Sequence, residues 1–250
     1  MINYAAVTNT GIREHNEDRI LLDGAVLAAG EKQGSSEETL FATVCDGVGG
    51  EAFGEEAAQI AAEIISAQPP ILSEQDALNA VQQANEAILS AQAVDSAHSR
   101  MASTVAGIAI QGSDIVVFNV GDSKVYRYRA PYIAQLSVDH TYAKEVVQYG
   151  LVVSADALTE GERHRITRCL GDSNAWQPAI VEGKDRVFPG DIYLLCSDGL
   201  SDVVTEDTME AILAQEASLE TKCSQLLALA LRQGSQDNIS IILVEAVKNG

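Results

Sequence analysis

The stretch that decides the fold is Leu40-Phe41-Ala42-Thr43-Val44-Cys45-Asp46-Gly47-Val48-Gly49-Gly50. Its first six residues form a nearly continuous apolar run, which is typical of a strand buried on both faces. Asp46 comes at the end of that strand, and Gly47 lets a backbone carbonyl approach a ligand where a side chain would obstruct it. Because a single aspartate in a glycine-rich turn is common, this stretch alone leaves an ordinary turn open as an interpretation.

Three further acidic segments adjoin apolar runs that predict strands, namely Asn16-Glu17-Asp18, Ser197-Asp198-Gly199 and Asp237-Asn238. Carboxylates gathered from distant strand ends repel one another unless a cation lies between them. We therefore expect Asp46, Asp198 and Asp237 to hold two hard divalent cations, with one carboxylate bridging them and water completing the coordination. A two-metal site of this kind activates water for hydrolysis, most often at phosphorus.

The order of the expected elements argues against a doubly wound parallel sheet, because strands do not alternate singly with helices. Instead, sheets with helix pairs packed outside them fit the pattern, and short turns between the strands favour antiparallel neighbours. Residues 30–36 are expected to form a loop, and residues 1–250 a single domain without a linker. Strands are expected over 4–7, 20–22, 40–45, 103–110, 115–120, 124–129, 191–196 and 239–247, and helices over 54–67, from 73 onward, 205–215 and 219–233.

The charge balance limits the class of substrate. The chain has 16 Lys and Arg against 36 Asp and Glu, a net charge of −20, so a nucleic acid would be repelled at long range. Neither a signal peptide nor a run long enough to cross a bilayer is found, so we expect a cytoplasmic protein with no membrane partner.

Arg13 adds a cation suited to an anionic substrate, because its planar guanidinium can donate two parallel hydrogen bonds to a phosphate. It lies four residues before Glu17, so a surface ion pair between the two is an equally good interpretation of the spacing alone.

An ordered series of motifs runs from about residue 5 to 246. Its segments are Arg13 with Asn16-Glu17-Asp18, Asp46-Gly47-Val48-Gly49-Gly50, Ala102-Ser103-Thr104, Asn119-Val120-Gly121-Asp122-Ser123, Leu136-Ser137-Val138-Asp139-His140, Thr167-Arg168-Cys169-Leu170-Gly171, Ser197-Asp198-Gly199-Leu200 and Asp237-Asn238-Ile239-Ser240. In this order the series resembles the metal-dependent protein phosphatases of type 2C in their compact bacterial form.

The resemblance implies an α+β fold, a four-layer α-β-β-α sandwich in which two mostly antiparallel sheets pack face to face between helix pairs. It implies that Asp46 bridges two Mn²⁺ or Mg²⁺ ions and that the Gly47 carbonyl binds one of them. Asp198 and Asp237 would hold the other ion. Asp122, together with Asp198, matches the position of a third, weaker ion.

The remaining implied roles concern the substrate and the water molecules. Glu17 and Asp18 resemble groups that orient metal-bound waters, and Arg13 resembles the residue that grips the phosphoryl group. His140 and Arg168 bracket a segment that forms a mobile flap in the family, and residues 150–166 depart most from the family pattern. Val48 stands where many eukaryotic members have a histidine proposed as the general acid, so the donor of the leaving-group proton stays open.

The leading hypothesis is a protein serine/threonine phosphatase in which a water activated by two metal ions attacks phosphorus in line, without a phosphoenzyme. Its partners would be phosphoproteins, in opposition to a Ser/Thr kinase, and we expect a monomer. The alternative is a catalytically weak, phosphoprotein-binding regulator of the same fold. Such regulators usually lose a metal aspartate, whereas all three are present here. Small phosphate esters remain an alternative substrate class.

Overall fold

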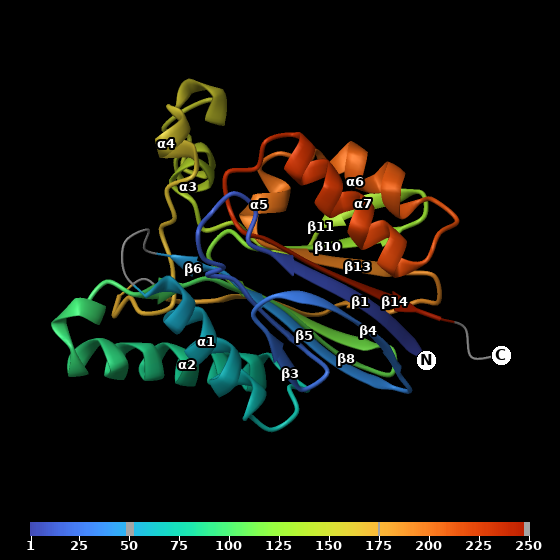
Figure 1. Ribbon diagram of the computed structural model, residues 1–250, viewed down its shortest axis with the longest axis horizontal. Helices are drawn as coiled ribbons and strands as arrows, with labels where there is room; N and C mark the ends of the chain where they lie inside the picture. The colour runs from blue at the N-terminus through green and yellow to red at the C-terminus, as the bar shows by residue number, and fades with distance from the viewer. Residues whose placement is uncertain (49–52, 175, 248–250) are drawn as a thin grey trace.

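A computed structural model describes residues 1–48, 53–174 and 176–247, and two six-stranded sheets form its centre (Figure 1). Neighbouring strands are antiparallel throughout both sheets. The first sheet has the order β11 (Tyr132–Gln135), β10 (Lys124–Arg129), β13 (Ile192–Cys196), β14 (Ile239–Ala246), β1 (Ile2–Asn9) and β4 (Gly30–Ser36). The second has the order β12 (Ala179–Arg186), β9 (Asp114–Val120), β8 (Val105–Gln111), β5 (Thr39–Cys45), β2 (Arg19–Leu22) and β3 (Ala25–Leu27).

Helices cover the outer faces of the two sheets and also form a projecting lobe (Figure 1). The second sheet is covered by α1 (Gly54–Ser66) and α2 (Glu74–Val94). The first sheet is covered by α5 (Asp198–Ser201), α6 (Glu206–Leu213) and α7 (Leu219–Arg232). The lobe contains α3 (Tyr142–Gln148), a short 3₁₀ turn (Ala155–Ala157) and α4 (Glu160–Arg163), and a second 3₁₀ turn (Ser96–His98) follows α2. A two-stranded ribbon joins β6 (Gly47–Val48) to β7 (Ala102–Ser103).

The alternation of side chains along β13 explains the sandwich. Tyr193 and Leu195 belong to the core between the two sheets, whereas Ile192, Leu194 and Cys196 belong to the core beneath α6 and α7. Because successive side chains point to opposite faces, a strand enclosed by a second sheet and by helices must be apolar at every position. The predicted α+β fold with face-to-face antiparallel sheets is thereby confirmed.

The expected helix starting near residue 73 is also present, and Ser73 caps its first turn. The Ser73 hydroxyl accepts a hydrogen bond from the Asp76 backbone N–H at 3.2 Å and donates to the Asp76 carboxylate at 2.8 Å. This arrangement satisfies one of the free N–H groups of the first helical turn.

The expected loop over residues 30–36 is wrong, because these residues form β4, the edge strand beside β1. Its sequence is polar because most of its residues are exposed at the edge of the sheet, where charge discourages pairing with another chain. A Cβ at Gly34 would meet the Tyr4 hydroxyl, so any larger residue there would force the Tyr4 side chain to move.

The expected strand 103–110 is interrupted, because Thr104 leaves the ladder between β7 and β8. Besides β4, four strands (β3, β6, β11 and β12) and three short helices (α3, α4 and α5) were not expected. Each of these helices has seven or fewer residues, which is too short for a helical period to be visible in the sequence. No helix in the described part of the chain has the length and apolar character needed to cross a membrane.

Candidate active site

Strand pairing brings the predicted acidic segments to one end of the sandwich. In the first sheet, Cys196 at the end of β13 pairs with Ile241 near the start of β14, which follows Asp237. In the second sheet, Cys45 at the end of β5 pairs with Arg19 at the start of β2. The residues just beyond these ends therefore share one rim, although they lie up to about 220 positions apart in the sequence.

Asp46 is fixed through its backbone by the segment between β7 and β8. The Thr104 backbone N–H donates to the Asp46 carbonyl at 2.8 Å, and the Asp46 N–H donates to the Thr104 hydroxyl at 3.2 Å. The Ser103 hydroxyl donates to the same carbonyl at 3.1 Å. These bonds leave the Asp46 carboxylate free to face a ligand. Thr104 belongs to one of the motifs that carry the family resemblance, but nothing in the sequence indicated that it binds the backbone of Asp46.

Asp18 lies beneath the rim and is almost completely buried, with 1% of its surface exposed. Burial raises the pKa of its carboxyl group to about 6, while hydrogen bonds from Ser240 and Ser197 act in the opposite direction. The Ser197 hydroxyl donates to this carboxylate at 2.8 Å and thereby connects the second sheet to the end of β13.

Asp122 and Asp198 each have a buried carboxylate oxygen, Oδ1, that has no hydrogen-bond partner among the described residues. A buried carboxylate oxygen without a partner is costly, and such atoms in native proteins require an explanation. Burial raises the pKa of Asp122 to about 6. It also raises the pKa of Asp198 well above its usual range, and the charge of Asp122 is the next cause.

The carboxylates of the rim repel one another. Burial raises the pKa of Asp46 well above its ordinary value, and the charges of Asp18, Asp198, Asp122 and Asp237 raise it further. The oxygen-only donors and the two unpartnered oxygens fit hard divalent cations. No three Asp, Glu, His or Cys side chains in the described ranges are arranged to hold a metal alone. Any ion bound here would therefore need backbone and water oxygens as well.

Gly47 lies against the first turn of α1. A Cβ on Gly47 would lie 2.3 Å from the backbone carbon of Gly54, and a Cβ on Gly54 would lie 2.9 Å from the Gly47 carbonyl oxygen. The same Cβ would lie 3.0 Å from a carboxylate oxygen of Glu17, so that carboxylate also lies beside Gly54. Burial, followed by the charge of Glu55, raises the pKa of Glu17. The neighbouring Gly49-Gly50 pair lies outside the described residues.

Arg13 pairs with Asp237 rather than with Glu17. Its Nη2 lies 2.7 Å from the Asp237 carboxylate, and its Nε donates to the Gln236 carbonyl at 2.9 Å. The Arg13 side chain is 45% exposed, so it remains open to solvent on the rim. Among the described residues, Arg13 therefore forms its ion pair with Asp237 and not the surface pair with Glu17 that the spacing allowed.

Asn238 is a residue whose role the sequence did not reveal. Its amide nitrogen donates to the carbonyls of Thr10 and His15, both at 2.9 Å, and its amide oxygen accepts the Glu17 N–H at 2.8 Å. One side chain at the start of β14 thus holds the loop that contains Arg13 and Glu17.

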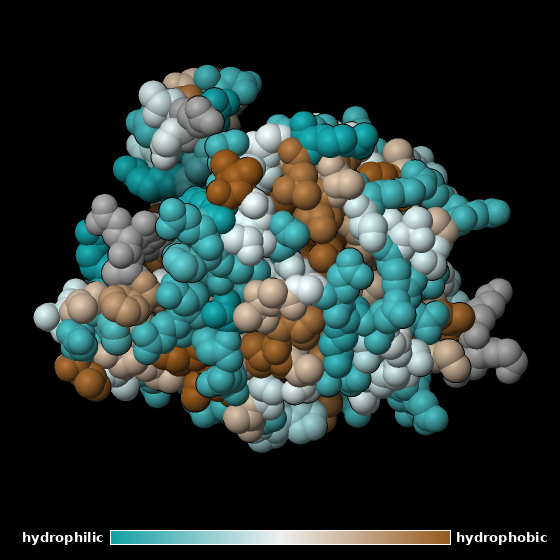
Figure 2. All heavy atoms as spheres, viewed as in Figure 1, coloured by the Kyte–Doolittle hydropathy of each residue, from teal (hydrophilic) through white to brown (hydrophobic). Residues whose placement is uncertain are grey.

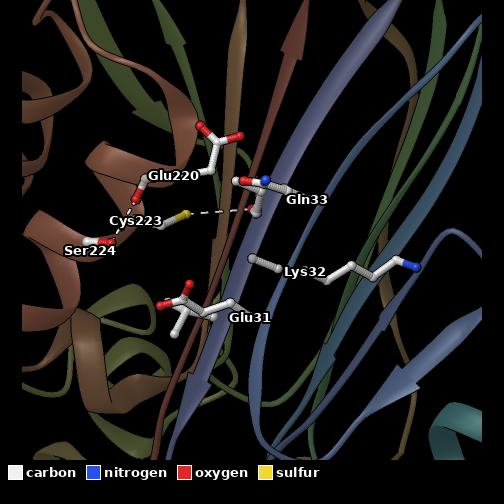
Figure 3. Close-up of a pocket in the computed structure, with 9 residues that line it drawn as sticks. Glu31, Lys32, Gln33, Glu220, Cys223 and Ser224 are labelled. Atoms are coloured by element: carbon white, nitrogen blue, oxygen red, sulfur yellow. Dashed lines mark hydrogen bonds between the residues drawn. The ribbon is translucent and has the colours of Figure 1, made fainter.

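A cavity of about 260 Å³ lies elsewhere, between α7 and the β1–β4 edge (Figure 3). Glu31 and Glu220 line it, and the Cys223 thiol donates to the Ala5 carbonyl at 3.5 Å. Because burial raises the pKa of Cys223, its thiol is a poor nucleophile. None of the rim carboxylates lines this cavity, so we place the site at the rim.

Comparisons with known proteins agree with this geometry. Residues 2–239 match the family described as protein phosphatase 2C. The serine/threonine protein phosphatase PstP of Mycobacterium tuberculosis is 30% identical over 255 residues, covering 99% of this chain. The chain spans 45% of that relative's length.

Two solved structures extend the comparison. The serine/threonine phosphatase of S. agalactiae superposes with a TM-score of 0.85 at 25% identity, covering 99% of this chain and all of the other. The catalytic domain of PstP in complex with two manganese ions superposes with a TM-score of 0.77 at 27% identity, covering 99% and 100% of the two chains. The family resemblance found in the sequence is confirmed. The chain belongs to the protein phosphatase 2C family.

Proposed function

We propose that this chain is a protein serine/threonine phosphatase that hydrolyses phosphoserine and phosphothreonine in proteins, with two Mn²⁺ or Mg²⁺ ions and with residues 1–250 as one catalytic domain. The observation that carries the proposal is the group of mutually repelling rim carboxylates in which Asp122 and Asp198 each have a buried oxygen without a partner. The two manganese ions in the related PstP structure support the choice of metal.

The proposed ligands are the carboxylates of Asp46, Asp198 and Asp237 and the carbonyl of Gly47. Asp46 would bridge the two ions, because its backbone is fixed on both sides and its charge interacts with those of the other aspartates. Asp122 and Asp198 would hold a third, weaker ion. When bound, such ions stabilise charge on phosphoryl oxygens and lower the pKa of a coordinated water.

Glu17 and Asp18 would hold and orient water molecules beside the ions rather than bind the ions directly. Asp18 is suited to this role because Ser197 fixes one of its oxygens at 2.8 Å. The Glu17 carboxylate lies beside Gly54, at the start of α1, on the same side as the Gly47 carbonyl.

Arg13 would bind the phosphoryl group. Its guanidinium lies 2.7 Å from the Asp237 carboxylate and neutralises it. A cation at Asp237 would take over that neutralisation and leave Arg13 free to donate hydrogen bonds to the substrate. Phosphate binding by Arg13 is thereby tied to metal binding by Asp237.

The proposed partners are phosphoproteins whose phosphates are added by a Ser/Thr kinase, and a monomeric cytoplasmic enzyme stays a prediction. The alternative is a catalytically weak regulator that has the same fold and binds phosphoproteins without hydrolysing them efficiently. The aspartates at 46, 122, 198 and 237 are all present, which favours the enzyme.

The experiment compares wild type, Asp198→Asn and the matched control Asp207→Asn, which alters an exposed aspartate in the first turn of α6. We expect wild type and the control to hydrolyse phosphoserine and phosphothreonine peptides with Mn²⁺ and to stop in EDTA. Asp198→Asn should lose the activity and bind Mn²⁺ more weakly in calorimetry. Turnover of wild type at an equal rate in EDTA would refute the metal mechanism, and peptide binding without turnover would favour the regulator.

A further inference from the structure

The chain has a local concentration of positive charge next to its acidic rim. Residues 163–168 read Arg-His-Arg-Ile-Thr-Arg, with no carboxylate, in a chain with 16 basic and 36 acidic residues. We call Arg163, His164, Arg165 and Arg168 the basic strip. It begins at the last residue of α4 and returns along the lobe to the sandwich.

Both ends of the basic strip lie at the candidate active site. At one end, Nδ1 of His164 lies 2.9 Å from the carboxylate of Asp202, which is close enough to Asp122 and Asp198 for its charge to raise their pKa values. The lobe that carries the strip projects from the sandwich beside α5, which begins with Asp198 (Figure 1).

At the other end, burial lowers the pKa of His140, and the charge of the nearby Arg168 lowers it further, so these two side chains lie near each other. The His140 backbone N–H donates to the Gly121 carbonyl at 2.9 Å, and its Nδ1 accepts the Gly121 N–H at 3.1 Å. Gly121 immediately precedes Asp122, so this end of the strip is anchored beside the unpartnered carboxylate.

The guanidinium groups at the centre of the strip are available to a ligand. Arg163 and Arg165 are both exposed, and neither forms an ion pair with a described residue. The Arg165 guanidinium lies 3.9 Å from the centre of the Tyr142 ring, a contact that fixes its position and leaves its N–H edge free. In contrast, Arg129 is committed to the buried Asp191 at 2.7 Å. On the face shown in Figure 2, most of the lobe surface is hydrophilic.

We propose that the basic strip, through Arg163 and Arg165, binds Asp or Glu side chains that flank the phosphorylated residue, so that acidic phosphopeptides are the preferred substrate class. The inference rests on the proposed phosphatase function. An acidic substrate is repelled by the net charge of −20 at long range, and therefore needs a local cationic surface beside the site. Exposed guanidinium groups that match carboxylates in pairs provide it.

The test measures kcat and KM with Mn²⁺ for three phosphoserine peptides of equal length, flanked by Glu, Gln or Lys, and for p-nitrophenyl phosphate. The proteins are wild type, Arg163→Gln/Arg165→Gln, Arg163→Glu/Arg165→Glu, and Arg232→Gln as a control for an exposed arginine at the end of α7. We expect wild type to favour the Glu peptide. In Arg163→Gln/Arg165→Gln, the KM for the Glu peptide should rise by roughly three- to tenfold with kcat unchanged.

Further outcomes decide between the inference and its alternatives. The Glu variant should reverse the preference toward the Lys peptide, and the wild-type preference should weaken with added salt, since exposed charges are screened. Equal kcat/KM for all three peptides, or a variant that changes only kcat, would overturn the inference while leaving the phosphatase proposal intact. Failure of wild type to hydrolyse any phosphate compound would instead refute the proposed function. Unchanged turnover of p-nitrophenyl phosphate shows that the variants are folded.

Discussion

Replacing Asp122 by asparagine should stabilise the metal-free protein at neutral pH. Burial raises the pKa of Asp122 from 3.8 to about 6, because its charge is poorly solvated and one oxygen has no partner. Each unit of difference between the folded and unfolded pKa corresponds to about 1.4 kcal/mol, so ionised Asp122 lowers the free energy of unfolding by up to about 3 kcal/mol. The Asp122→Asn substitution removes this charge and keeps the size of the side chain.

The sign of the pH dependence follows from the direction of the shift. Above pH 6 the carboxyl is ionised in both states, so the full cost is present. As the pH falls from 6 towards 4, the folded state binds the proton first, and the cost decreases. The advantage of Asp122→Asn over wild type should therefore fall from about 3 kcal/mol at pH 7.5 to about 1 kcal/mol at pH 4.5.

Urea unfolding in EDTA at pH 7.5 and pH 4.5 measures the free energy of unfolding directly. Asp207→Asn serves as a control and should change it by less than about 0.5 kcal/mol, as is usual for an exposed position. With excess Mn²⁺, wild type should become the more stable protein, because an ion that binds only the folded state stabilises it. The reasoning is refuted if Asp122→Asn is less stable than wild type in EDTA at pH 7.5, or if its advantage is the same at both pH values.

Three other changes test separate parts of the structure. Burial and a nearby arginine lower the pKa of His140 to about 4. The free energy of unfolding should therefore fall by up to about 3 kcal/mol as the pH drops from 6.5 to 4, because the unfolded state binds the proton first. Urea unfolding should show a smaller fall for His140→Gln. Gly47→Ala would place a Cβ 2.3 Å from the backbone of α1. It should lower the free energy of unfolding by about 1–3 kcal/mol and weaken Mn²⁺ binding in calorimetry. The control Gly161→Ala, which has open space at its Cβ, should do neither. Arg13→Ala should raise KM for p-nitrophenyl phosphate without weakening Mn²⁺ binding, because it frees Asp237; weaker Mn²⁺ binding would contradict this pairing.

The parts of the fold that the sequence predicted are those with burial on both faces. The apolar run that becomes β13 can be recognised in the sequence as a buried strand, because all five of its residues are buried. The opposite case is β4, whose Glu, Lys, Gln and Ser residues lie on an exposed edge. Edge strands keep their backbone pairing with one neighbour and lose the apolar pattern, so residues 30–36 resembled a loop.

The site divides in the same way. The gathering of its acidic segments at one end of the sandwich could be predicted, because each segment adjoins a strand that is visible in the sequence. The partner of Arg13 could not, because Asp237 is 224 residues away and only the β1–β14 pairing brings it close. Thr104 and Asn238 act through hydrogen bonds to backbone groups, for which the sequence has no recognisable spacing.

The way these anchors cross between the sheets indicates that site formation and folding are coupled. Ser197, at the end of β13 in the first sheet, bonds Asp18, which precedes β2 in the second. Asn238 joins the start of β14 to the loop between β1 and β2. Carboxylates that repel one another can be held together only if packing of the core between the two sheets supplies the energy. The rim is therefore a site whose unfavourable charge is maintained by the stability of the whole sandwich, and a bound cation would relieve it.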